Sequence, residues 1–408
     1  MKKFLKKILY KLGYKLSKVK SETNNISIQS ERKYPNNSKF HVGCGSDILQ
    51  GYINVDVRQL PGVELVCKAW DLSSYTQNAS EIYSRHVVEH LTLAEVEFTL
   101  NDWFDALSIG GVVKGIVPNI TYHIGQWNKA TWTPQEYEDM KSNTRWGFAG
   151  FYGWQREADP SKSDYNSTYW DIHKSAFNEG NITFLLKKAG FSNINTQIVD
   201  EVHLHFEATK ILNKKERQVT PFLEYVREDH RARYNLAKNY IKENDKVLDA
   251  ACGIGYGSTI LLDKDCFITA VDLHEGALQY AKEYFFDEKT TFKNANVEED
   301  DLGDDYDVVV SFETIEHLPS PEKFLINVHN SLKKEGKFIC STPNEKIMPF
   351  RSTTFPYHIK HFTEIELESL LNDHGFAVEK WFCQNDRKSL EVEKGSEGLF
   401  MIAVCTKK

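Results

Sequence analysis

The stretch KVLDAACGIGYGS, residues 246–258, decides the fold. An apolar run that suits a strand ends here in a glycine-rich turn, and the residues after the turn suit a helix. Gly253, Gly255 and Gly257 let a ligand approach the backbone, and the start of the helix offers free N–H groups. Asp272 ends the next apolar run, where its carboxylate can accept both hydroxyl groups of a ribose. These residues predict a site for a nucleoside-containing ligand.

Downstream of this stretch, segments with strand and helix patterns alternate. The strand-like segments are 267–273, 306–312 and 337–343, and the helix-like segments are 276–285, 321–334 and 362–375. The run YDVVVSF at 306–312 is apolar without interruption, as in a sheet covered on both faces. The alternation predicts a doubly wound, Rossmann-like α/β domain.

The same motifs occur a second time, in the same order, in the first half of the chain. The pairs are HVGCGS (41–46) with DAACGI (249–254), INVDV (53–57) with ITAVDL (268–273), HVVEHL (86–91) with ETIEHL (313–318), IVPN (116–119) with STPN (341–344), and AGF (189–191) with HGF (374–376). His173 and Phe177 repeat the spacing of His358 and Phe362. Several matches in one order predict two related α/β domains in tandem, over 39–210 and 217–408.

The length predicts two or three domains, and the composition is close to that of soluble globular proteins. The chain has 408 residues, a formal net charge of −8 and seven cysteines without a C-x-x-C pair. This charge argues against a protein held on nucleic acid mainly by phosphate contacts. The cysteines rule out a zinc site of the C-x-x-C type and favour a reducing compartment, so we expect a cytoplasmic protein. The sequence does not indicate the oligomeric state.

The first 20 residues differ from the rest. They carry lysines and no acidic residue, and their apolar residues recur at steps of three and four. This pattern predicts a basic amphipathic helix over 1–20, which could attach the protein to the inner face of an anionic membrane as a peripheral protein. The alternative is a helix docked on the protein itself. The polar segment 21–38 predicts a linker.

The glycine spacing separates two classes of nucleoside site. The spacing is G-x-G-x-G, and Ser258 stands where a G-x-G-x-x-G motif has its last glycine. The block SFETIEHL (311–318) follows an apolar strand further on. The second domain therefore resembles class I S-adenosylmethionine (SAM)-dependent methyltransferases, and the lead-in ERQVTPF…HRARYNLA resembles methyltransferases of bacterial surface-polysaccharide clusters. A nicotinamide-dependent oxidoreductase is disfavoured, since that class has G-x-G-x-x-G.

The resemblance implies SAM as the cofactor and roles for particular residues. Gly253 and Gly255 would line its methionine part, Asp272 would hold the ribose, and Glu313 would face the transferred methyl group. The further cofactor-site residues that it implies are Asp249 and Asn296, the latter standing where the family usually has an aspartate near adenine.

The first domain resembles a compact branch of the same superfamily. Gly43, Gly45 and Asp56 remain, Asp71 could approach adenine, and the third glycine is absent. So few residues separate Gly45 from Asp56 that the first helix must be short or missing. Whether this domain binds SAM stays open, the alternative being a domain kept for packing or substrate presentation.

Methyl transfer to a hydroxyl oxygen needs a base, and a histidine suits that role at neutral pH. The candidates are His317, His358 and His361, with His90 and His173 in the first domain. The alternative is that the histidine of E-H-L packs the following helix. No metal site is predicted from the spacing, and a metal held by distant carboxylates stays open.

Residues 143–172 are rich in aromatic side chains set among glycine, arginine and aspartate. Rings stack on the C–H faces of sugars while charged groups bond their hydroxyls, so a functional loop is one interpretation and a packing lid is the other. Trp154, Arg156, His173 and Arg351 are the candidate residues for substrate binding.

The leading hypothesis is an O-methyltransferase for a glycan or glycan precursor of cell-surface polysaccharide, with the second domain catalytic. A small lipophilic acceptor, such as a phenol or quinone, is the alternative substrate class. A third possibility is that the first domain is a non-catalytic scaffold or substrate-binding module.

Overall fold

The computed structural model describes residues 34–156, 159–163, 165, 170–214 and 217–408. The predicted basic helix over 1–20 and most of the predicted linker lie outside these residues. Among the described helices, none combines the length and the apolar character needed to cross a bilayer. The boundaries 39–210 and 217–408 stay a prediction, and the strands of each of the two sheets fall within them.

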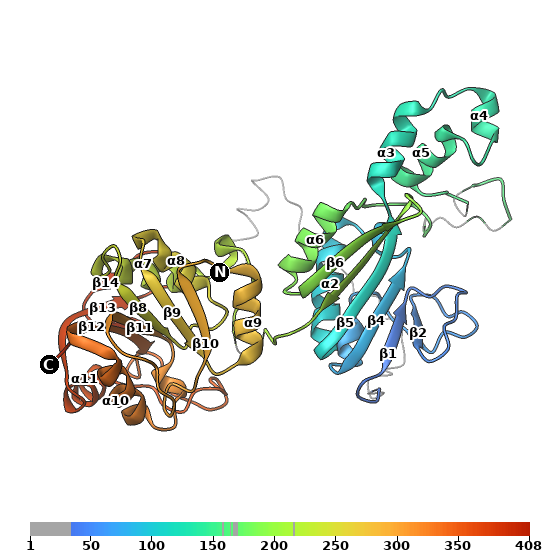
Figure 1. Ribbon diagram of the computed structural model, residues 1–408. Coiled ribbons are helices and arrows are strands. Elements are labelled where there is room, and N and C mark those ends of the chain that lie inside the picture. Colours follow the sequence, from blue (N-terminus) through green and yellow to red (C-terminus); the bar gives the residue numbers. More distant parts are fainter. Residues whose placement is uncertain (1–33, 157–158, 164, 166–169, 215–216) are drawn as a thin grey trace, which may run out of the picture. The chain divides into compact units, whose positions relative to one another are not determined.

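The first sheet has seven strands in the order β3-β2-β1-β4-β5-β7-β6 (Figure 1). All neighbours are parallel except β7, which runs antiparallel to both β5 and β6. The strands are β1 (Lys39–Val42), β2 (Ile53–Asp56), β3 (Leu65–Val66), β4 (Ala79–Arg85), β5 (Leu107–Pro118), β6 (Ser192–Val199) and β7 (His203–Thr209).

The second sheet repeats this order as β10-β9-β8-β11-β12-β15-β13, with β14 added at the edge. Its antiparallel strand, β15, is inserted at the place that β7 has in the first sheet. The strands are β8 (Lys246–Ala250), β9 (Phe267–Asp272), β10 (Thr290–Asn294), β11 (Tyr306–Phe312), β12 (Leu332–Pro343), β13 (Phe376–Gln384), β14 (Glu393–Lys394) and β15 (Phe400–Lys407). The predicted fold class, two doubly wound α/β domains, is confirmed.

Helices lie between some of the strands in both domains. In the first they are α2 (Leu93–Ala106), α3 (Ile120–Lys129), α4 (Pro134–Glu138), α5 (Asn143–Tyr152) and α6 (Glu179–Lys188). In the second they are α7 (Glu228–Ala237), α8 (Tyr256–Leu261), α9 (Glu275–Tyr284), α10 (Pro321–Ser331) and α11 (Glu364–Asp373). Within the described part of the first domain no helix separates β1 from β2, as the short spacing predicts.

The central strands of the second sheet are buried on both faces. Val308, Val309 and Val310 of β11 are at most 1% exposed, because successive side chains enter different apolar clusters on opposite faces. Val309 packs in one cluster with Phe324 of α10, and Val308 and Val310 pack in the other with Leu261. This explains the uninterrupted apolar run seen in the sequence.

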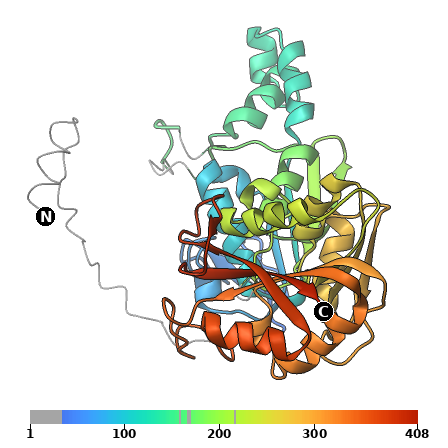
Figure 2. The same cartoon turned by 90° about the vertical axis from the view of Figure 1, so that its left-hand side faces the viewer.

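The first domain carries a helical insertion after β5, formed by α3, α4 and α5 (Figure 2). Helices α3 and α5 approach closely because glycines face the partner helix. A Cβ atom at Gly150 would lie 2.1 Å from the His123 side chain, and one at Gly147 would lie 2.7 Å from the Trp127 backbone. The Nδ1 of His123 donates to the carbonyl of Trp146 at 2.8 Å, which fixes the pair.

Candidate functional site

The glycine-rich turn and the acid of the next strand are joined directly in the second domain. The backbone N–H of Gly253 donates to Oδ2 of Asp272 at 2.9 Å, and Oδ1 of Asp272 accepts from the backbone N–H of His274 at 2.9 Å. Gly253 has φ of 60°, and a Cβ atom there would meet nothing within 4 Å. The turn therefore presents open space beside a carboxylate that is 8% exposed.

The other glycines of the turn are required by packing. Gly255 begins α8 with φ of 88°, and a Cβ atom there would lie 2.8 Å from Ala281. A Cβ atom at Gly257 would collide with the ring of Tyr234 at 1.9 Å. Gly253 thus has the open surroundings that a ligand needs, whereas Gly255 and Gly257 let the turn and helix pack.

Asp249, predicted to contact the cofactor, is instead enclosed beneath the turn. Its side chain is fully buried, Oδ2 accepts from the Ser258 hydroxyl at 2.7 Å, and Oδ1 accepts from the Tyr234 hydroxyl at 3.2 Å. Burial raises the pKa of Asp249 to about 7. Because both oxygens are engaged within the protein, the geometry assigns Asp249 to supporting the turn.

Asn296 lies just beyond β10, where the chain turns. Its Oδ1 accepts from the backbone N–H of Glu298 at 2.9 Å, and its own N–H donates to Asp300 at 2.7 Å. The side-chain carbonyl therefore stabilises the turn, and contact with adenine stays a prediction.

Glu313 follows β11 with φ of 54°, in the left-handed region, and is held by side chains that the sequence analysis missed. Its Oε1 accepts from the Ser341 hydroxyl at 2.9 Å and lies 3.4 Å from Nη1 of Arg233. Arg233, in α7, is fully buried, and it also pairs with buried Asp229 at 3.2 Å and donates to Gln384 at 2.7 Å. The stretch HRARYNLA, singled out for its resemblance, contains this arginine.

Two of the predicted catalytic residues, His317 and His358, meet Glu316 beside the end of β11. Glu316, His317 and His358 each offer one ligand atom, and these atoms all lie within 4.8 Å of one another. The rings of His317 and His358 are 4.6 Å apart between centroids. The backbone carbonyl of Glu316 accepts from the N–H groups of Ile359 and Lys360, which fixes His358 beside the E-H-L block.

The carboxylate of Glu316 is unusual in being 1% exposed with neither oxygen bonded to a partner within the described residues. Burial, with a smaller contribution from Glu313, raises its pKa well above the ordinary value. Burial also lowers the pKa of His358 to about 4, which keeps that ring neutral at pH 7.

His361 does not reach this space as a base. It is 1% exposed, its Nδ1 donates to the Met348 carbonyl at 2.6 Å, and its Nε2 accepts from Nδ1 of His358 at 2.7 Å. Both ring nitrogens are used within the protein, so the geometry corrects the predicted catalytic role to one of positioning His358.

The first domain keeps the same framework at its glycine turn. The N–H of Gly45 donates to Oδ2 of Asp56 at 2.9 Å, the distance found between Gly253 and Asp272. Gly43 has φ of 70°, and a Cβ atom there would collide with Val87 at 2.3 Å.

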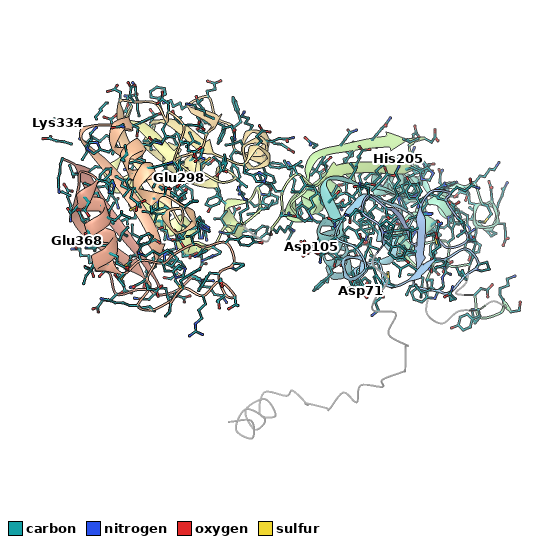
Figure 3. The ribbon with its side chains drawn as sticks, turned by 90° about the horizontal axis from the view of Figure 1, so that it is seen from below. Asp71, Asp105, His205, Glu298, Lys334 and Glu368 are labelled. Atoms are coloured by element: carbon teal, nitrogen blue, oxygen red, sulfur yellow. The ribbon has the colours of Figure 1, made fainter. Side chains whose placement is uncertain are left out.

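The aspartate of each turn faces an arginine, and the two arginines differ in how closely they approach. Nη1 of Arg217 lies 3.7 Å from Oδ1 of Asp272. Arg58 donates through Nε to Oδ1 of Asp56 at 3.1 Å, and its Nη2 would lie 3.7 Å from a Cβ atom on Gly45. Its guanidinium thus lies in the space that is open beside Gly253. Asp71, labelled in Figure 3, is exposed and accepts from the Ser74 hydroxyl at 2.9 Å.

The histidines of the first domain form a matching cluster. Glu89, His90 and His173 offer ligand atoms within 4.8 Å of one another, and the two rings are 5.2 Å apart between centroids. His86 takes the place of Glu313, with φ of 53°, and its Nδ1 lies 2.9 Å from Oε1 of Glu89. The backbone bridges Asn119–Phe177 and Asn344–Phe362 complete the correspondence.

The four residues predicted to bind substrate do not form one site. Trp154 and Arg156 line a cavity of about 510 Å³ in the helical insertion, with Tyr137, Arg145 and Asp159 among the other lining residues. His173 lies in the first-domain cluster and does not line this cavity. Arg351 is exposed in a turn after β12 and does not line it either.

The fold and the Gly253–Asp272 pair agree with the predicted nucleoside site, and comparison with known proteins gives the kind of domain that this part of the chain resembles. Residues 222–380 match the model of a family described as "Methyltransferase domain". This part of the chain thus matches a methyltransferase domain, and the match and its SAM-dependent relatives imply SAM as the cofactor.

Individual relatives agree with that class. A "Probable S-adenosylmethionine-dependent methyltransferase" of Mycolicibacterium smegmatis is 33% identical over 136 residues, 33% of this chain and 52% of that protein. A "Ubiquinone biosynthesis O-methyltransferase" of Rickettsia felis is 30% identical over 124 residues, 30% of this chain and 49% of that protein. The chain thus spans about half the length of the curated relatives it matches.

Among solved structures, an S-adenosylmethionine-dependent methyltransferase from Mesorhizobium loti is similar, with 18% identity and a TM-score of 0.38. The match covers 44% of this chain and all of that chain.

The second domain fits SAM. The open space at Gly253 admits a ligand against the backbone, and Asp272 offers carboxylate oxygens at its rim. When bound, SAM supplies a methyl group on a sulfonium, which is already an activated leaving group. The chain's own residues then have to orient the acceptor and receive its proton.

Proposed function

We propose that the second domain transfers a methyl group from SAM to a hydroxyl oxygen of a glycan or glycan precursor of cell-surface polysaccharide. The observation that carries the methyl-transfer part is the open Gly253 turn bonded to Asp272 within a methyltransferase domain. An oxygen acceptor is favoured because a relative of this domain is named an O-methyltransferase.

The sugar class of the acceptor is supported by the cavity in the helical insertion. Aromatic rings of Tyr137 and Trp154 line it together with charged groups from Arg145, Arg156 and Asp159. Rings stack on the C–H faces of a pyranose, and charged groups bond its hydroxyls. In this proposal the insertion binds part of a long acceptor whose reacting hydroxyl enters the second domain.

In the second domain, His317 and His358 are the residues proposed to contact the reacting hydroxyl. They lie with Glu316 just beyond β11, and the resemblance expects Glu313, at the end of that strand, to face the transferred methyl group. His361 holds the ring of His358 in place.

We propose that the first domain serves as an accessory, substrate-presenting module. Arg58 is hydrogen-bonded to Asp56 and borders the space beside Gly45, whereas Arg217 stays 3.7 Å from Asp272 and leaves the space beside Gly253 open, so a ribose in the first domain would have to displace a bonded guanidinium. Proposals that rest on the sequence alone are attachment of residues 1–20 to an anionic membrane and a cytoplasmic location at its inner face.

A phenol or quinone is the second candidate acceptor. It is favoured by the relative named for ubiquinone biosynthesis. Incubating the protein and SAM with nucleotide-linked sugars, polysaccharide fragments and simple phenols, and following methyl transfer by mass spectrometry, separates the two classes.

The cofactor assignment is tested by titrating SAM calorimetrically into the wild type, Asp272→Ala and Asp56→Ala. The two variants lose the same bond to a glycine N–H, so they are matched in what they disturb. We expect one site in the wild type, weakened roughly 10- to 100-fold in Asp272→Ala by loss of charge-assisted hydrogen bonds, and unchanged in Asp56→Ala. Absence of SAM binding to the folded wild type would contradict the proposed function.

A further inference from the structure

The two histidine clusters have the same composition at equivalent places in the two domains. One contains Glu316, His317 and His358, and the other contains Glu89, His90 and His173. Two residues of each cluster follow β4 or β11 in the chain. The third, a histidine, precedes by four residues the phenylalanine that bridges to the asparagine just after β5 or β12. Two nitrogen donors and one oxygen donor from distant segments thus converge twice in one chain.

The hydrogen bonds of the second-domain histidines determine which nitrogen can act as a ligand. Nδ1 of His317 lies 2.8 Å from the Tyr357 carbonyl, which can only accept, so Nδ1 carries the proton. His361 likewise donates from Nδ1 to Met348, so its Nε2 must accept the proton of Nδ1 of His358. In the neutral rings of both His317 and His358, Nε2 is therefore left with its lone pair.

The first domain fixes its histidines in the same way. Nδ1 of His90 donates to the Ile172 carbonyl at 3.1 Å, and Nδ1 of His173 donates to the Gly150 carbonyl at 3.0 Å. Outer hydrogen bonds from Nδ1 to a carbonyl are the usual support of a metal-ligating histidine, because they set the tautomer and the ring orientation.

The buried carboxylates of Glu316 and Glu89 lack some or all of the hydrogen-bond partners that a buried carboxylate usually has. Neither oxygen of Glu316 and only one of the two oxygens of Glu89 is hydrogen-bonded within the described residues, although both side chains are 1% exposed. A buried carboxylate without a partner is costly, and a cation removes that cost.

We propose that each domain binds one divalent transition-metal ion, through Glu316, His317 and His358 in the second domain and through Glu89, His90 and His173 in the first. Ligands at about 2.1 Å from one ion lie at most about 4.2 Å apart, so each cluster, now within 4.8 Å, contracts slightly around it. Two imidazoles and one carboxylate suit zinc, cobalt or manganese better than magnesium.

In the second domain, the ion would act as a Lewis acid toward the acceptor. An acceptor hydroxyl bound at an open coordination position would lose its proton to solvent water more readily, so His317 and His358 would serve as ligands rather than as bases. The acceptor oxygen would then form its bond to the methyl group as the bond from that methyl to the sulfonium breaks. This role rests on the proposed methyl transfer, whereas metal binding itself does not.

The test is a direct titration of the metal-free full chain, without SAM or acceptor. Zn²⁺ is followed by calorimetry and Mn²⁺ by the electron paramagnetic resonance signal of the free ion. The variants are Glu316→Gln and Glu89→Gln, which keep side-chain shape at equivalent positions, with His374→Ala as control at a histidine outside both clusters. Circular dichroism confirms that each variant is folded.

We expect two sites in the wild type and in His374→Ala, one in each glutamine variant, and tighter binding of Zn²⁺ than of Mn²⁺ or Mg²⁺. Equal binding by all four proteins, or none by the folded wild type, would overturn the proposal. A single site abolished by Glu316→Gln would overturn it for the first domain. SAM titration of the metal-free protein keeps the tests apart, since SAM binding without metal binding refutes only the metal proposal.

Discussion

At the scale of single residues, Arg233 is the side chain on which the acidic groups around Glu313 depend. It is fully buried, pairs with Asp229 and Glu313, and lies 4.4 Å from the centroid of the Phe400 ring. Its charge is compensated by buried Asp229 and half-buried Glu313, and Asp229 also pairs with the more exposed Arg227. Removing one member of such a group leaves an uncompensated charge in the interior.

Arg233→Met should therefore lower the free energy of unfolding by about 3 to 5 kcal/mol, because Asp229 and Glu313 lose their buried partner. Urea denaturation followed by tryptophan fluorescence measures this. The control is Arg387→Met, since Arg387 lies over the same Phe400 ring but is exposed, and it should change stability by less than about 0.5 kcal/mol. Equal effects of the two substitutions would show that the ring contact matters and the ion pairs do not.

The sequence could predict some residues of the site and not others. The pairing of Asp272 with the glycine turn follows from local rules, since both stand at the carboxyl ends of neighbouring parallel strands. The place of Arg58 depends on how one long side chain folds back, which no spacing reveals. The meeting of Glu316 with His358 depends on the loop after β12, which lies far along the chain.

At the scale of elements, the turn between β8 and α8 contains glycines that are needed for two different reasons, packing and ligand access. Gly255 is needed because Ala281 leaves no room for a Cβ atom, whereas Gly253 has room that only a ligand would fill. A side chain at Gly253 should therefore disturb the ligand more than the fold.

Gly253→Ala should weaken SAM binding at least about tenfold and cost roughly 1 kcal/mol of stability, the ordinary penalty of a positive φ. Gly51→Ala is the matched control, because Gly51 has φ of 80° and a Cβ atom there would also meet nothing within 4 Å. Thermal unfolding and SAM titration of both proteins check the result. If Gly51→Ala weakened SAM binding as much, Gly253 would not line the cofactor site.

Most helices and strands follow from the sequence pattern, and their ends are decided by caps. Helix α11 begins after Thr363, whose hydroxyl and Glu366 form a capping box, so it is shorter than the predicted segment 362–375. Helix α10 ends at Ser331 rather than at 334, because the chain enters β12 at Leu332. Periodicity alone could not place that transition, since Leu332 fits the apolar face of either element.

At the scale of the whole molecule, the described chain repeats one strand order in two sheets, and Arg58 is bonded to Asp56 at one turn while the space beside Gly253 is open at the other. No strand is shared between the two sheets of the described chain. A ligand of one domain should then stabilise that domain without stabilising the other.

Differential scanning calorimetry should show two unfolding transitions, only one of which responds to SAM. At a SAM concentration about 100 times the dissociation constant, the stabilisation is about 2.7 kcal/mol, which raises the midpoint of that transition by about 5 to 10 °C. Asp272→Ala should reduce the response to at most about half, because its SAM binding is weaker, and Asp56→Ala should retain it in full. A single transition that moves as a whole would show that the two domains unfold together.

The edge strands of the two sheets are relevant to aggregation, because copies of the chain could pair through them. An exposed edge strand is a template for another chain, and short or charged edges prevent this. β3 and β14 are two residues long, and β14 consists of Glu393 and Lys394. β6 is the longest edge, with eight residues, and its pairing is interrupted between Ser192 and Asn195. Edges that are short, charged or irregular therefore oppose pairing with another chain. Removing the irregularity of β6 is the change that we expect to favour fibre formation most.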